Sequence, residues 1–115
     1  MKKKRAVEKK RTGTGRSQEL YIGLVRLHVL HHAAEEPIFG LGIMQELGRH
    51  GYRLGPGTIY PLLHSMERRG WLKSKSRLVH GHHRKVYSAT RAGRGMLVQA
   101  RKQVRELFEE MCEEA

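Results

Sequence analysis

The side chains of this sequence that could do chemistry are mainly cations, histidines and hydroxyl groups. Between Arg68 and Arg94 there are nine Lys or Arg residues and no acidic residue. Clustered cations without carboxylates repel one another and attract polyanions, above all the phosphates of nucleic acids. Exposed cations are often simply solvated, but this segment lacks any compensating acid. We therefore expect residues 68–94 to bind nucleic acid.

Histidines form a second candidate site. His28 and His32 lie four residues apart, with His31 between them, so they would share one face of a helix. Such a pair could hold Zn²⁺ or a similar divalent ion, with further ligands from Glu35, Glu36, water or a partner subunit. Histidines beside leucines are more often packed core or interface residues. The sequence requires no cofactor, and a divalent metal effector at His28 and His32 is one hypothesis for regulation.

Enzymatic chemistry has little support in the sequence. The chain contains neither Asp nor Asn, which excludes Asp-dependent triads and Asp-held Mg²⁺ sites. Complete motifs for phosphate binding, for a serine nucleophile and for a zinc protease are absent. The lone Cys112 cannot form an intramolecular disulfide. We therefore expect a binding protein and not an enzyme.

Length and charge indicate one small basic domain. The chain has 115 residues and a formal net charge of +12. Residues 1–16 are strongly basic with almost nothing to bury, so we expect a disordered tail that is either solubilising or adds non-specific affinity for nucleic acid. No apolar run approaches the ~20 residues that a membrane span needs, and the charged start lacks the apolar stretch of a signal peptide. These features predict a cytoplasmic protein without membrane contacts.

Apolar periodicity predicts three helices that would carry these side chains. The first covers residues about 18–33 with Ser17 as its N-cap, the second ends near Arg49 before Gly51, and the third covers about 56–69. Their inner faces are expected to be Leu20, Leu24, Leu27 and Leu30 or His31; then Phe39, Ile43, Met44 and Leu47; then Ile59, Leu62, Leu63 and Met66. Gly40 and Gly42 are expected to allow close packing where the second helix begins.

A hairpin and a long last helix follow. We expect strands over residues 71–79 and 84–89, joined by a four-residue loop at 80–83, and then a helix capped by Thr90. Apolar residues on that helix recur at heptad spacing, which predicts a homodimer interface. The interface residues are Leu97, Ala100, Val104, Leu107 and Met111, with the adjacent Phe108.

This order of elements predicts a mainly α protein, a winged helix-turn-helix with a basic β-hairpin wing and a C-terminal dimerisation helix. The expected parts are the tail at 1–16, the DNA-binding domain at 17–90 and the last helix at 91–115. The third helix would enter the major groove of double-stranded DNA, while the wing would contact flanking phosphates. The expected DNA-binding residues are Thr58, Tyr60, His64, Ser65 and Arg68 on the helix, and Lys75, Arg77, His82, His83, Arg84 and Lys85 on the wing. Two alternatives stay open. Tyr60 could serve only to pack against the hairpin, and Arg68 and Arg69 could serve only as C-terminal charges that complement the helix dipole.

Two segments of the sequence resemble the PadR family of bacterial transcriptional regulators. They are residues 52–72, YRLGPGTIYPLLHSMERRGWL, and residues 84–94, RKVYSATRAGR. The resemblance spans about residues 20–97, and the single last helix is similar to the branch with a short C-terminal part. It implies that Thr58, Tyr60, Pro61 and His64 occupy recognition-helix positions, that Arg84 and Lys85 occupy wing positions, and that the protein is a homodimeric repressor.

Three departures from the family pattern concern the helix starts and the effector. Gly55 stands where Ser is common, which removes an N-cap hydroxyl, and Arg91 stands where an acid is common. The only Trp is Trp71, in the wing, so the last helix lacks the Trp that lines a drug-binding pore in multidrug-responsive relatives. The effector, whether a small molecule or a metal, is therefore not indicated by the resemblance.

The function predicted from these features is that of a DNA-binding transcriptional regulator acting on an inverted-repeat operator. The alternative is a non-sequence-specific basic protein that binds RNA or serves as an architectural DNA-binding protein. The alternative predicts no dimer, and it predicts equal affinity for an operator and for random duplex.

Overall fold

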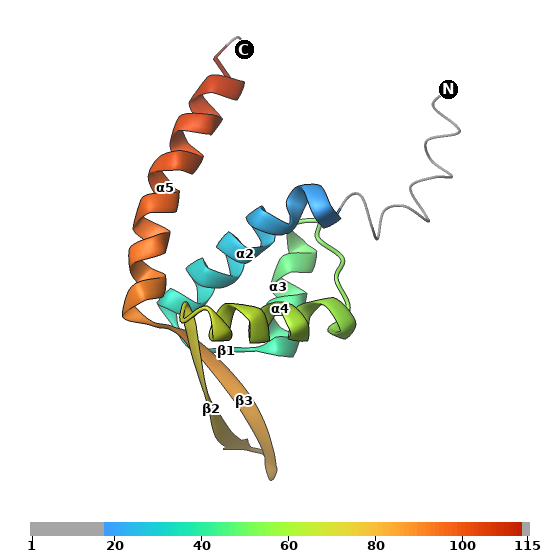
Figure 1. Ribbon diagram of the computed structural model, residues 1–115. Helices are drawn as coiled ribbons and strands as arrows, with labels where there is room; N and C mark the ends of the chain where they lie inside the picture. The colour runs from blue at the N-terminus through green and yellow to red at the C-terminus, as the bar shows by residue number, and fades with distance from the viewer. Residues whose placement is uncertain (1–17, 114–115) are drawn as a thin grey trace, which may run out of the picture.

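The computed structural model describes residues 18–113, so the predicted tail and the predicted Ser17 cap lie outside the described residues. The elements in chain order are α2 (Gln18–Glu35), β1 (Ile38–Phe39), α3 (Gly40–Arg49), α4 (Pro56–Arg68), β2 (Leu72–Val79), β3 (His82–Ala89) and α5 (Arg91–Met111). Helices α2, α3 and α4 form the body, from which α5 and the β2–β3 hairpin project in opposite directions (Figure 1). Among the described helices, none is both long and apolar enough to cross a membrane.

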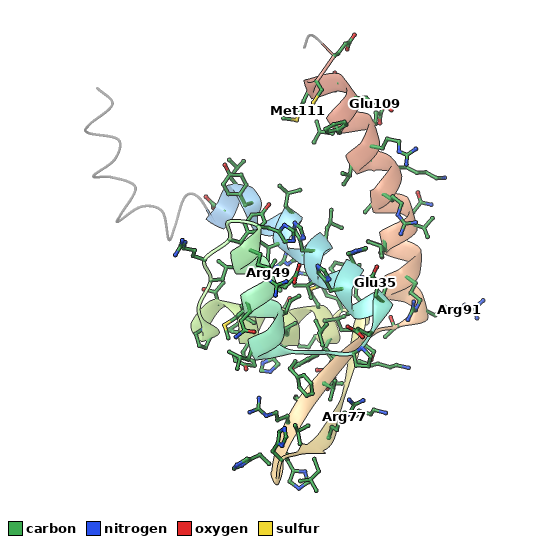
Figure 2. All side chains as sticks on the ribbon, turned by 180° about the vertical axis from the view of Figure 1, so that it is seen from behind. Glu35, Arg49, Arg77, Arg91, Glu109 and Met111 are labelled. Carbon is green, nitrogen blue, oxygen red and sulfur yellow. The ribbon has the colours of Figure 1, made fainter. Side chains whose placement is uncertain are left out.

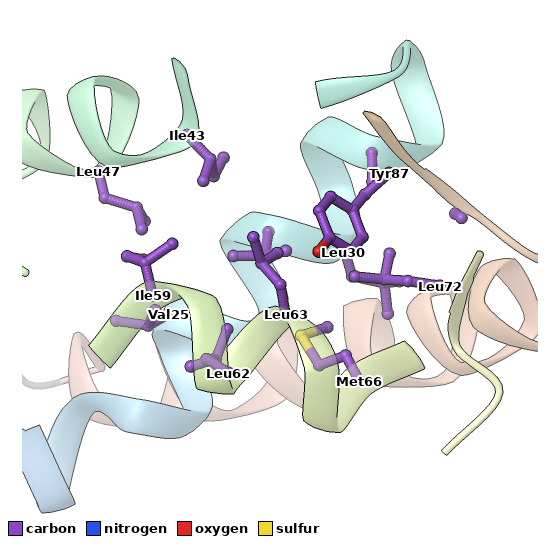
Figure 3. Close-up of a cluster of buried hydrophobic side chains, with 13 residues drawn as sticks. Val25, Leu30, Ile43, Leu47, Ile59, Leu62, Leu63, Met66, Leu72 and Tyr87 are labelled. Atoms are coloured by element: carbon purple, nitrogen blue, oxygen red, sulfur yellow. The ribbon is translucent and has the colours of Figure 1, made fainter. Parts of the chain in front are cut away.

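The core lies between α2, α3, α4 and the base of the hairpin (Figure 3). The predicted inner face of α2 is confirmed only in part, because Leu30 is buried and Leu27 is half-buried but the other predicted leucines are not. Its buried residues are Val25, Val29, Leu30 and Ala33, whereas Leu20 is 73% exposed and Leu24 is exposed. Since α2 is apolar on two sides, periodicity alone could not distinguish the side that meets the body from the side that faces α5.

Helices α3 and α4 form the helix-turn-helix, and most of their predicted facing residues are buried: Ile43, Leu47, Ile59, Leu62, Leu63 and Met66. Met44 is only half-buried, and Phe39, also half-buried, lies in β1 and not in α3. The turn between them contains Gly51 at φ +91°, a conformation that favours glycine. Gly40 packs closely, because a Cβ there would lie 2.5–2.6 Å from the ring of Tyr60. The same prediction was wrong for Gly42, whose Cβ would meet nothing within 4 Å.

Helix α4 begins without a side-chain cap. Gly55 is the N-cap residue, and its carbonyl accepts hydrogen bonds from the backbone N–H groups of Thr58 and Ile59, each at 3.0 Å. Pro61 lies within the helix, four residues after Gly57. The helix that is expected to read DNA therefore starts on backbone hydrogen bonds alone, as the missing hydroxyl at Gly55 predicts.

The sheet is antiparallel in the order β1-β3-β2. Strand β1 was not predicted, because two residues are too short to show a periodic pattern. The predicted four-residue hairpin loop was also wrong. His80 and Gly81 adopt positive φ values of 50° and 79°, so two residues make the turn and β3 begins at His82, which pairs with Val79.

Helix α5 begins at a well-defined position beside the hairpin. The Thr90 hydroxyl accepts a hydrogen bond from the backbone N–H of Gly93 at 2.9 Å, which confirms the predicted N-cap. The same hydroxyl donates to the Gly70 carbonyl at 2.6 Å, and the guanidinium of Arg94 donates to the Ala34 carbonyl at 2.9 Å. These bonds join the first turn of α5 to the hairpin and to the end of α2.

A methyl group at Gly93 should destabilise the fold. Its Cβ would overlap the backbone carbonyl oxygen of Trp71, which already accepts the N–H of Thr90, and would lie 3.2 Å from Leu30 Cδ1. We expect Gly93→Ala to lower the free energy of unfolding by about 2 kcal/mol or more, because the overlapped atom belongs to the backbone. Gly95→Ala is the matched control, since a Cβ there meets nothing within 4 Å and alanine favours the helix. Equal stability of the two variants in chemical denaturation would contradict this packing.

Candidate nucleic-acid interface

Helix α4 presents its predicted DNA-binding residues on the side away from the core. Its buried residues Ile59, Leu62, Leu63 and Met66 follow helical spacing on one side. On the other side, Pro61, His64 and Arg68 are exposed, and Thr58 and Ser65 are half-buried. The structure therefore brings together the recognition-helix residues that the sequence singled out.

Tyr60 differs from its neighbours on α4. Its ring lies against Gly40 at the start of α3, and 38% of the residue is exposed. The tyrosine thus packs the two helices of the helix-turn-helix together while keeping part of its surface accessible. The packing partner considered from the sequence was the hairpin, whereas the structure places Gly40 there.

The wing divides its cations between two faces. Cross-strand partners share a face of a sheet, and the register pairs Arg77 with Arg84 and Lys75 with Val86. Lys85 pairs with Ser76 on the opposite face, which is also the face of Leu72 and Tyr87 at the core. Three of the four predicted wing cations, Lys75, Arg77 and Arg84, therefore share one face of the hairpin, and Lys85 lies on the other. The imidazoles divide in the same way, since His82 pairs with Val79 and His83 with Leu78.

No carboxylate neutralises the wing cations within the described part of the chain. Every ion pair that forms there involves Glu35 or Glu46, and neither residue lies on the hairpin. Glu67 is close to the hairpin, but it accepts a hydrogen bond from the Ser74 hydroxyl at 2.7 Å. Arg77 and Arg84 lie directly across the strands from each other, an arrangement of like charges that a bound anion would relieve.

Three further cations extend this surface; they belong to the basic segment 68–94 but were not among the individual DNA-binding residues expected from the sequence. Lys73, Arg91 and Arg94 line a shallow hollow with Lys75 and Ser88, where the base of the hairpin meets the first turn of α5. Figure 2 shows Arg77 on the hairpin and Arg91 where α5 begins. The charge count between Arg68 and Arg94 was a signal for these residues, but their proximity to the hairpin depends on the tertiary structure.

The predicted dimer residues lie along α5. Leu97 packs against the core and Ala100 is half-buried, whereas Val104, Leu107, Phe108 and Met111 are exposed. Helices α2 and α5 diverge from a common end (Figure 1), and an apolar groove runs between them. The groove is lined by Leu24, Leu27, His28, His31, Leu97, Ala100, Arg101, Val104, Arg105 and Phe108.

The histidines of α2 meet the end of α3. The ring of His28 stacks on that of His50, with centroids 4.8 Å apart, and the ring of Tyr52 stands edge-on at 5.5 Å. Glu46 Oε2 lies 3.8 Å from His32 Nε2 and 3.2 Å from His50 Nε2. Burial, followed by the nearby His50 and His32, holds the pKa of His28 below its ordinary value, so this imidazole is neutral at neutral pH.

A helix-turn-helix, a cationic hairpin beside its second helix and a projecting last helix define a winged helix-turn-helix protein. The model of the PadR-like family of transcriptional regulators matches residues 29–99. The chain belongs to this family. PadR regulators are non-enzymatic and bind DNA, usually as dimers, which agrees with the expectation that this protein is not an enzyme.

Individual relatives agree with this assignment. The chain is 49% identical over 94 residues to the transcriptional regulator Rv3488 of Mycobacterium tuberculosis, covering 82% of this chain and 88% of the relative. A PadR family regulator from Eggerthella lenta has a similar fold, with a TM-score of 0.75 and 25% identity, and the match covers 93% of this chain and 95% of the other. A Streptococcus transcriptional regulator gives a TM-score of 0.73 at 27% identity, covering 80% and 92%. The predicted fold class is confirmed.

Proposed function

We propose that this PadR-family regulator is a homodimeric repressor that binds an inverted-repeat operator. In this proposal α4 enters the major groove and reads bases, while the wing contacts the phosphates of flanking DNA. The two α4 helices of a dimer would enter successive major grooves roughly 34 Å apart. This spacing is the reason that the operator should be an inverted repeat.

The observation that carries the proposal is the uncompensated charge of the wing next to the exposed polar side of α4. Arg77 and Arg84 oppose each other with no carboxylate in ion-pair distance among the described residues. His64 and Arg68 offer hydrogen-bond donors on the exposed side of α4. A charged wing alone would suit any nucleic acid, whereas a wing beside an exposed helix with hydrogen-bonding groups suits a specific duplex.

The dimer has separate support from the apolar surface of α5. Leucine, phenylalanine and methionine side chains beyond Val104 have no core to contact in one chain. A second α5 packed along the α2–α5 groove would remove them from water, and a twofold axis would bury the same surface on both chains.

The test compares two duplexes of equal length and base composition at one stated salt concentration. One comes from the region upstream of the gene for this protein, and the other has a shuffled sequence. We expect the upstream duplex to bind at least about 1,000-fold more tightly, with one dimer bound per duplex. Equal affinities, or equal competition by an unrelated RNA, would contradict the operator-binding proposal and favour a non-specific basic nucleic-acid-binding protein. Raising the salt concentration should weaken the binding of both duplexes.

A further inference from the structure

We propose that His28, His32 and His50, with Glu46, form a binding site for a divalent transition-metal ion that connects α2 to the turn of the helix-turn-helix. Sequence spacing pointed only to the pair on α2. The third imidazole comes from the residue that caps the end of α3, and the site thus joins two elements that are separate in sequence.

The geometry requires only small side-chain movements. One nitrogen of each of the three imidazoles lies within 4.8 Å of the others. Imidazole nitrogens that share a tetrahedral Zn²⁺ ion at 2.0–2.1 Å are ~3.4 Å apart. His50 is exposed and has room to rotate toward His28 and His32, which are half-buried.

Glu46 supplies the fourth ligand. Its Oε2 atom is the atom that approaches both His32 and His50, at 3.8 Å and 3.2 Å. Three neutral imidazoles and one carboxylate form a ligand set that suits Zn²⁺ and related first-row ions, whereas Ca²⁺ and Mg²⁺ prefer oxygen ligands. The same carboxylate also contacts Arg49 at 2.9 Å, a contact at an exposed position that costs little to give up.

A second group of candidate ligands uses His32 as well, so the two groups are alternatives. It consists of His31, His32 and Glu35, all on α2, with two of its three members exposed. His31 lines the α2–α5 groove, where the proposed dimer partner would lie. The group around His50 is favoured, because it has two half-buried imidazoles, His28 and His32, and because the Glu46 carboxylate approaches both His32 and His50.

The position of the proposed site, between α2 and the helix-turn-helix, would allow a bound ion to affect DNA binding. His50 precedes the turn that leads into α4, and His28 also lines the groove between α2 and α5. An ion bound here would therefore fix α2, which borders the proposed dimer surface, relative to the end of α3, from which the turn leads into the helix that is expected to read DNA. A ligand shifts a conformational equilibrium only if it binds the two states with different affinity. An ion that needs ligands from both α2 and the end of α3 binds more tightly when these two elements are close together than when they are apart.

The test measures metal binding to the full chain after any affinity tag has been removed. Competition with a chromophoric chelator gives the Zn²⁺ affinity and stoichiometry, and Co²⁺ substitution reports tetrahedral coordination by its visible absorption. We expect one tight site per chain and a thermal unfolding midpoint that rises with Zn²⁺. His50→Gln should weaken Zn²⁺ binding at least about 100-fold and remove the thermal shift. His50 is exposed, so this variant should fold.

The matched control is His31→Gln, which removes a ligand only from the competing group. It should keep the affinity and the Co²⁺ spectrum of the unaltered chain. Loss of binding in His31→Gln with retention in His50→Gln would overturn the proposed site, as would tight binding in both variants. Zn²⁺ at saturation should also change the affinity for the operator in the unaltered chain but not in His50→Gln. An unchanged operator affinity would overturn the effector role, whereas the metal measurements test the site independently of DNA.

Discussion

Leu107→Glu should convert the protein from a dimer into a monomer of 13.3 kDa. Leu107 is 53% exposed and Met111 is 73% exposed in the single chain, so neither contributes to its core. In the proposed dimer these side chains pack against the second α5, where a buried carboxylate without a partner would be strongly unfavourable. The fold of the isolated chain should persist, because Leu107 lies outside the core.

The measurement is sedimentation equilibrium, with operator binding as the second readout. Two linked half-site contacts gain roughly 10²–10⁴ in affinity over one, so the monomer should lose at least about 100-fold in operator affinity. Gln99→Glu is the matched control, since it adds the same charge at an exposed position of α5 away from the groove. An unchanged mass for Leu107→Glu would refute the dimer interface assigned to α5.

Substitutions on α4 and on the wing should weaken DNA binding in different ways. Tyr60→Ala should reduce the discrimination between operator and random duplex, because base contacts carry specificity. Arg84→Ala combined with Lys85→Ala should weaken both duplexes about equally. It should also reduce the slope of log affinity against log salt by roughly one unit for each phosphate that the wing no longer neutralises. Deleting residues 2–11 should act like the wing change.

The packing of Tyr60 against Gly40 calls for two companion variants. Tyr60→Phe keeps the ring and removes the hydroxyl, while His64→Ala alters an exposed residue on the same helix. Loss of discrimination in His64→Ala and Tyr60→Ala, with normal thermal stability, would locate base reading on α4. The opposite pattern, with specificity lost from the wing variant and uniform weakening from the α4 variants, would reverse the proposed roles.

The sequence predicted the elements that show an apolar repeat over several turns or a capping residue next to the element. Helices α3, α4 and α5 follow from apolar periodicity, from Gly51 and from the Thr90 cap, because capping and helical spacing depend on neighbours within four residues. The cationic character of the wing could also be predicted, because the number of Lys and Arg residues in a segment does not depend on the fold. The residues of α4 outside its core could also be identified, because they are the positions that remain once the buried positions at helical spacing are assigned; His64 and Arg68 are exposed, and Thr58 and Ser65 are half-buried.

Only the tertiary structure decided the features that join distant segments. The buried side of α2 depends on which neighbour each of its two apolar sides meets. The core contains Val25 and Val29, whereas Leu20 and Leu24 are exposed. The pairing of β1 with β3, the two-residue turn at His80 and the contact between His28 and His50 follow from long-range packing. Such contacts carry no periodic signal along the chain, because their energy arises only when segments far apart in sequence are brought together.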